Sequence, residues 1–179
     1  MKTVFAKASL SFLLLLVSYY SNAQGNINWS KPEDVYYRTI KDLCEYLHQH
    51  ANLQKNRDYI TDKWVLFDYI LNDTSLSRKQ KRIKKLDVLL ASFKNFIDSA
   101  GLENIDAKPL RYYKDSPEIY GLFSGPLSDH INQIFVYFNK KTPTIPIGYL
   151  LFDEITGKLI SWILIKEGGE CYFLTFNIM

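Results

Sequence analysis

The residue pattern changes at Gly101, and this change constrains the fold more than any other feature of the 179-residue chain. Before Gly101, apolar residues recur at intervals of three and four, as they do along one face of an α-helix. After Gly101, short runs of aromatic and β-branched residues alternate with turn residues, which is typical of strands. Helices followed by strands predict an α+β domain in which helices pack on an antiparallel sheet.

Three helices are predicted before Gly101. The first covers residues 31–53 and begins at SKPE (30–33), which has the form of a capping box. The second covers residues 60–72. The third covers residues 78–99 and should stop at Gly101, because glycine commonly follows the last helical residue.

Four strands are predicted after Gly101, and they cover residues 134–139, 147–153, 158–166 and 171–178. Residues 110–114 would add an edge strand, which gives a sheet of four to five strands. The connections EITG (154–157) and EGGE (167–170) are short and contain glycine. The last three strands are therefore expected to form an antiparallel meander.

Residues 1–23 have the pattern of a secretory signal peptide. Two lysines precede an apolar run, Ala8–Val17, and small residues end at Ala23. This run is too short to span a bilayer, which takes about 20 residues, and no transmembrane span is predicted downstream. The expected mature chain, residues 24–179, is a single secreted or periplasmic α+β domain. Cleavage would remove two lysines and lower the formal charge from +3 to +1, which argues against nucleic acid as a partner.

The predicted strands have one core face and one mixed face. The core face holds Ile134, Val136, Phe138, Leu150, Phe152, Ile160, Trp162, Leu164, Leu174 and Phe176. The mixed face provides the candidate ligand-binding residues, which are Tyr137, Tyr149, Ser161, Ile163, Phe173 and Thr175. If helices cover both faces of the sheet, the mixed face is part of the core and has no binding function. Alternatively, it lines a pocket for an apolar small molecule, or two copies of the chain pack through it.

Cys44 and Cys171 are the two cysteines of the chain. A disulfide would join the first helix to the last strand and add about 4–5 kcal/mol on the chain-entropy model. The alternative is two buried free thiols. Cys44 and His48 share one side of the first helix, but His50 lies about 200° around the helix from His48. No metal site and no cofactor are predicted.

Ser124, Ser128, Asp129 and His130 lie together in the loop 123–130. Adjacent residues cannot act as nucleophile, base and orienting group for one another, because a catalytic triad needs convergent side chains. This loop is expected to be a turn.

The segment SRKQKRIKKL (77–86) carries six basic residues at the start of the third predicted helix. A helical wheel places Arg78, Lys81, Arg82 and Lys85 in one exposed stripe, about 110° from the centre of the apolar face. The stripe is either a solvated helix face or a contact surface for an anionic partner, such as lipid head groups or an acidic protein.

These features favour a small, exported, non-enzymatic binding domain over an enzyme. Its partner would be an apolar small molecule, a second copy of the chain or another protein. The alternative is a small secreted hydrolase with residues of the 123–130 loop near the sheet.

Overall fold

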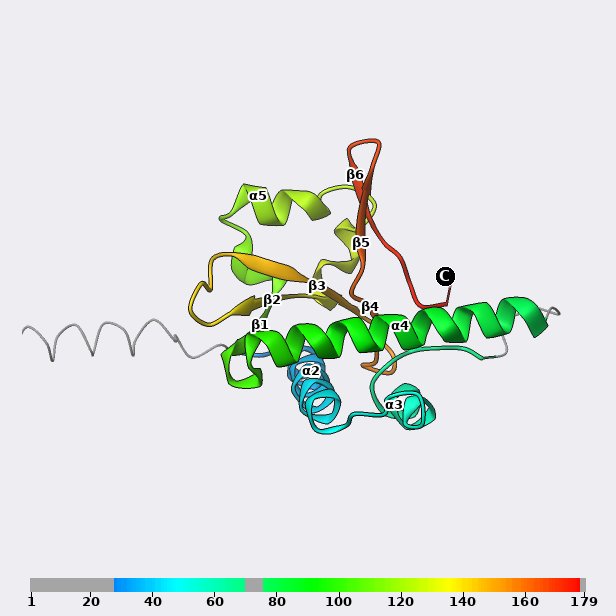
Figure 1. The fold of residues 1–179 in the computed structure, drawn as a ribbon. Helices are drawn as coiled ribbons and strands as arrows, with labels where there is room; N and C mark the ends of the chain where they lie inside the picture. Colours follow the sequence, from blue (N-terminus) through cyan, green and yellow to red (C-terminus); the bar gives the residue numbers. More distant parts are fainter. Residues whose placement is uncertain (1–27, 70–75, 178–179) are drawn as a thin grey trace, which may run out of the picture. The chain divides into compact units, whose positions relative to one another are not determined.

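The computed structural model describes residues 28–69 and 76–177. The chain is α+β: it has helices, a four-stranded antiparallel sheet and a separate two-stranded sheet (Figure 1). The residues from Lys31 onward form one compact unit. The predicted leader, residues 1–23, lies outside the described residues.

The helical elements of this unit comprise α-helices and short 3-10 helices. The described α-helices are α2 (Lys31–Gln49), α3 (Arg57–Lys63), α4 (Leu76–Ala100) and α5 (Pro117–Tyr120). The described 3-10 helices are η1 (Leu102–Asn104), η2 (Leu110–Tyr113), η3 (Gly121–Phe123) and η4 (Ser128–Gln133).

The strands are β1 (Ile105–Pro109), β2 (Ile134–Asn139), β3 (Pro146–Phe152), β4 (Leu159–Ser161), β5 (Leu164–Glu167) and β6 (Glu170–Phe173). The four-stranded sheet has the order β1-β2-β3-β4, and β5 pairs with β6.

The first and third predicted helices are present as α2 and α4, although α2 ends at Gln49, four residues before the predicted end at residue 53. In α4, Leu86, Leu90 and Ile97 are fully buried, as the apolar spacing requires. The helix ends at Ala100, and Gly101 follows with φ +81°, a conformation that residues with a Cβ rarely adopt.

The second predicted helix is shorter than expected. Helix α3 ends at Lys63, and the chain then runs beside the free edge of β4. The Leu159 N–H donates to the Trp64 carbonyl oxygen at 2.7 Å, and the Leu66 N–H donates to the Leu159 carbonyl oxygen at 2.8 Å. These bonds hold residues 64–66 extended, so tertiary pairing overrides the helical spacing here. Residues 70–72 of the prediction lie outside the described residues.

The edge strand is β1, and the prediction of a strand at residues 110–114 is wrong. Ile105, Ala107 and Pro109 are buried at alternate positions, which is the strand pattern. In η2 the buried residues are Leu110 and Tyr113, whose spacing of three matches one turn of a 3-10 helix.

The single strand predicted at residues 158–166 is divided between the two sheets. β4 ends at Ser161, and β5 begins at Leu164 as part of the β5–β6 hairpin. The predicted meander of the last three strands is therefore not formed: β3 pairs with β4 in the four-stranded sheet, whereas β6, which ends at Phe173, pairs with β5 in the separate sheet.

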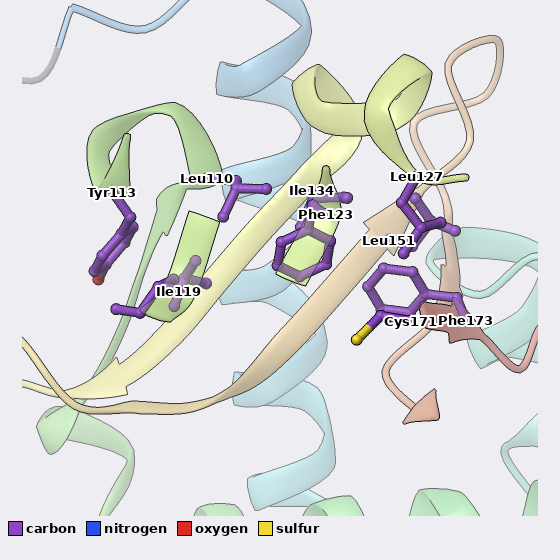
Figure 2. Close-up of a cluster of buried hydrophobic side chains, with 10 residues drawn as sticks. Leu110, Tyr113, Ile119, Phe123, Leu127, Ile134, Leu151, Cys171 and Phe173 are labelled. Carbon is purple, nitrogen blue, oxygen red and sulfur yellow. The ribbon is translucent and has the colours of Figure 1, made fainter. Parts of the chain in front are cut away.

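Both faces of the four-stranded sheet carry buried side chains. On one face, Tyr36 of α2 stacks on Phe152 at a ring distance of 4.8 Å and meets Phe135 edge-on at 6.1 Å. On the other face, Ile134 and Val136 belong to a cluster built with residues from η2, α5, η3 and β6 (Figure 2). The central strands therefore have no wet face.

Candidate functional site

The register of the sheet separates the residues predicted to share the mixed face. In an antiparallel pair, directly opposed residues project to the same side. Tyr149 is opposed to Val136, and Tyr137 is opposed to Gly148. Because successive residues of a strand alternate between faces, Tyr137 and Tyr149 lie on opposite sides of the sheet. The single face predicted from sequence is not formed.

Tyr137 is packed between the sheet and α4. Its ring makes edge-on contacts with Phe93 and Phe96 at centroid distances of 5.9 and 5.8 Å. Gly148 leaves room for this ring, because a Cβ at that position would lie 2.6 Å from the Tyr137 ring atoms. Burial raises the pKa of the Tyr137 hydroxyl to about 12. These contacts make Tyr137 a packing residue.

Tyr149 and Phe173 contribute to the cluster on the other face. Phe123 contacts both rings, at centroid distances of 5.0 Å to Tyr149 and 6.2 Å to Phe173. Figure 2 shows Phe173 and Cys171 next to Leu151 in this cluster. Tyr149 is half-buried and Phe173 is buried, so both fill space in the core.

Ser161 has a local structural role. Its buried hydroxyl donates to the Leu174 carbonyl oxygen at 2.7 Å and accepts from the Ile163 N–H at 3.0 Å. These bonds fix the chain at the point where it leaves β4 and begins the hairpin. Thr175, which is half-buried, follows Leu174.

Ile163 is the predicted face residue that lines a cavity. A groove of about 500 Å³ lies between α4 and the segments on either side of the hairpin. We call it the α4 groove, and it is lined by Lys81, Lys84, Lys85, Val88, Leu89, Ile163 and Leu174. Trp162, next to Ile163, stacks on Phe93 of α4 at 5.0 Å and thereby holds this wall against the helix.

The walls of the α4 groove are apolar and its rim is cationic. Four aliphatic side chains and the methylene stems of three lysines form the walls, while the ammonium groups extend toward water. Within residues 28–69 and 76–177, no ion pair or hydrogen bond engages the side chains of these lysines. Two residues of the predicted basic stripe, Lys81 and Lys85, and one residue of the predicted mixed face, Ile163, therefore lie together in this groove.

Arg82 is buried, so its predicted place in the exposed basic stripe is wrong. Its side chain is 7% exposed, and its guanidinium lies 4.9 Å from the Phe67 ring centroid. It also donates to the Asp68 carbonyl oxygen at 3.0 Å. Phe67 and Asp68 belong to the segment after α3, which covers this side of α4. The sequence pattern predicted a helix for this segment, and the contact was therefore missed. Arg78 is exposed but does not line the groove.

Two other hollows have more polar linings. One, of about 510 Å³, includes Asp87 and Lys94. Asp87 forms a two-bond ion pair with Arg57, and Lys94 pairs with Asp98 at 3.0 Å. The other, of about 460 Å³, lies beside η2 and includes the Tyr113 side chain. Neither combines an aliphatic wall with unpaired cations.

Cys44 and Cys171 are free thiols in the structure, and both are buried. Cys44 interacts with Tyr137 on the α4 side of the sheet, whereas Cys171 interacts with Tyr149 on the other side. The sheet lies between the two cysteines, and of the two alternatives the structure has the buried free thiols rather than the disulfide. Burial raises the pKa of the Cys44 thiol to about 12, against a smaller lowering by Lys41.

The two neighbouring histidines have separate partners. The His48 ring bonds Asp98 at 2.8 Å, and this bond, together with one from Lys94, lowers the pKa of the Asp98 carboxyl. The His50 ring stacks on Tyr46 at 3.9 Å. In the part of the chain that the structure describes, no three His, Cys, Asp or Glu side chains are arranged to hold a metal ion.

The loop 123–130 has local contacts. The Ser124 hydroxyl donates to the Gly121 carbonyl oxygen at 2.9 Å, and the His130 ring bonds the Gln133 side chain at 3.0 Å. No hydrogen bond among the described residues joins His130 to Ser124 or Ser128.

Comparison with protein-family models, curated proteins and solved structures finds no match for this chain. Over the described residues, none of the helices has the length and apolar character that crossing a membrane requires.

Proposed function

We propose that the protein is an exported, non-enzymatic binding domain that holds an apolar small molecule in the α4 groove. Export is supported by the leader pattern of residues 1–23. The observation that carries the proposal is the exposed aliphatic wall of the groove. Val88 is 61% exposed on α4, and it faces the same hollow as Leu89, Ile163 and Leu174.

The size and chemistry of the groove suit a small ligand. Small-molecule sites usually have volumes of about 300–1,000 Å³ and predominantly apolar walls, and the groove of about 500 Å³ falls within that range. Covering apolar surface is favourable by about 25 cal/mol per Å². An apolar ligand would therefore gain free energy here without any catalytic group.

Catalysis is less well supported. A hydrolase would need a nucleophile in contact with a base, and the hydroxyl of Ser124 instead bonds a backbone carbonyl in its own turn. The groove walls contribute no carboxylate, histidine or cysteine.

Binding of the neutral dye Nile red tests the proposal. We expect saturable binding, and we expect Val88→Asp to weaken it at least about tenfold, because the variant places a charge on the apolar wall. Ile145→Asp is the matched control, since Ile145 is 62% exposed and lies outside the groove. It should leave the affinity unchanged.

The measurement requires protein that sedimentation velocity shows to be monomeric, because a second copy is the competing occupant of the groove. Equal dye affinity in both variants would refute the proposal. A dimer that Val88→Asp converts to a monomer would also refute it, because the groove would then be an interface.

A further inference from the structure

We infer that the ligand of the α4 groove is a single-chain anionic amphiphile, with its acidic head group at the lysines and its hydrocarbon chain on the aliphatic wall. This inference rests on the proposed function and specifies the ligand class.

The lysines of the groove form an uncompensated cationic group. Lys81 and Lys85 are four residues apart on α4, and like charges at this spacing repel each other. Lys84 adds a third positive charge one residue before Lys85. An anionic head group would relieve this repulsion, whereas a neutral ligand would not.

Charge and apolar surface are separated along the groove. Lys81, Lys84 and Lys85 precede Val88 and Leu89 on the same helix, and the step from Lys81 to Val88 spans about 10 Å at 1.5 Å per residue. Ile163 and Leu174 supply the facing wall. The groove therefore has a cationic end and an apolar end, which is the distribution that a head group and a chain require.

The shape favours one chain over a bilayer surface. The groove is open, and a single hydrocarbon chain lying in it would contact α4 on one side and the facing wall on the other. A bilayer surface would reach the outward-facing Val88 and the lysines, but it would not reach the half-buried Leu89, Ile163 and Leu174. We therefore assign the groove to a free amphiphile of the fatty-acid type.

Calorimetric titration with decanoate and decanol at pH 7.5, below the micelle concentration, tests the assignment. The two ligands share a chain and differ in head-group charge. We expect decanoate to bind at least about tenfold more tightly, and this preference should shrink as salt is raised. Decyltrimethylammonium, with the opposite charge, should bind more weakly than decanol.

Charge reversal identifies the lysines as the cause. The triple variant K81E/K84E/K85E should lose the preference for decanoate and retain decanol binding. The control K63E/K140E/K141E changes the net charge equally at three exposed lysines outside the groove, and it should keep the preference.

Each contrary result has a distinct meaning. Equal affinities for decanoate and decanol, both weakened by Val88→Asp, would overturn the ligand class and leave the proposed function in place. Affinities that Val88→Asp does not change would overturn both. Lysine-dependent binding to vesicles of phosphatidylcholine with phosphatidylglycerol, without decanoate binding, would replace the free amphiphile by a membrane surface.

Discussion

Gly148 is expected to be essential because its missing side chain makes room for Tyr137. A Cβ at position 148 would lie 2.6 Å from both Cε1 and Oη of that ring. The ring cannot easily move away, since Phe93 and Phe96 hold it from the α4 side. Gly148→Ala should therefore destabilise the protein by about 1–3 kcal/mol, the usual cost of overpacking.

Urea denaturation of two further variants separates this clash from other effects of glycine replacement. Gly125 has no atom within 4 Å of an added Cβ and no positive φ, so Gly125→Ala should be neutral or stabilise by up to about 1 kcal/mol. In a Tyr137→Ala background, adding Gly148→Ala should cost almost nothing, because its steric partner is gone. A Gly148→Ala variant as stable as Gly125→Ala, or one whose cost persists without the Tyr137 ring, would refute the reasoning.

Four further predictions concern buried groups. Thiol titration with a disulfide reagent, without reductant, should find no reactive cysteine in the native protein and two after denaturation, whereas a Cys44–Cys171 bond would give none in either state. Because burial raises the pKa of the Cys44 thiol from its ordinary value near 9 to about 12, its ionisation favours the unfolded chain. The contribution of Cys44 to the free energy of unfolding should therefore be constant below about pH 9 and fall above it. Cys44→Ala should reduce the fall between pH 9 and 10 in urea denaturation, and the remainder comes from tyrosines such as Tyr113 and Tyr137, whose pKa values are also raised. An unchanged slope would contradict the assignment. Arg111→Met would remove the bidentate partner of the buried Glu33 carboxylate. Because the Arg111 side chain is 41% exposed, a loss of about 1–3 kcal/mol is expected by the same assay. Ser161→Ala would remove the bonds to Leu174 and Ile163, which should lower the free energy of unfolding by about 1–3 kcal/mol. It should also weaken decanoate binding. Unchanged affinity would show that Ser161 does not shape the groove.

Local signals predicted the parts of the fold that depend on local contacts. The spacing in α4 and the glycine after it fixed the longest described helix to within two residues at its start and one at its end. The run IFVYFN predicted β2 at its observed bounds, Ile134–Asn139. In both segments, propensity and burial pattern agree.

The failures occur where long-range pairing determines the conformation. The segment after Lys63 has a helical spacing, but it also contains β-forming residues, and Leu159 pairs with its backbone. The strand assignment at 158–166 failed because the Ser161 side chain bonds the backbone of Leu174, 13 residues away. The sequence of neither segment predicts that its backbone or side chain will bond a residue so distant in the chain.

The candidate site was predicted as separate parts. Lys81 and Lys85 followed from the helical wheel, and Ile163 followed from strand parity. Their meeting with Leu174 could not be predicted, because parity within each strand does not give the register between strands. Tyr137 and Tyr149 were assigned to one face for the same reason, because the register between their strands was unknown. In the structure they lie on opposite faces of the sheet.

The break at Ser161 links the fold to the groove. An uninterrupted strand from 158 to 166 would have continued β4 along the edge of the four-stranded sheet. Ser161 instead bonds the Leu174 carbonyl and the Ile163 N–H, and Leu174 donates its own N–H to the Ile163 carbonyl oxygen at 2.9 Å. These bonds bring Ile163 and Leu174 together opposite α4, where they form the facing wall of the groove. A buried polar residue that ends a strand thereby creates the apolar surface on which the proposed ligand would lie.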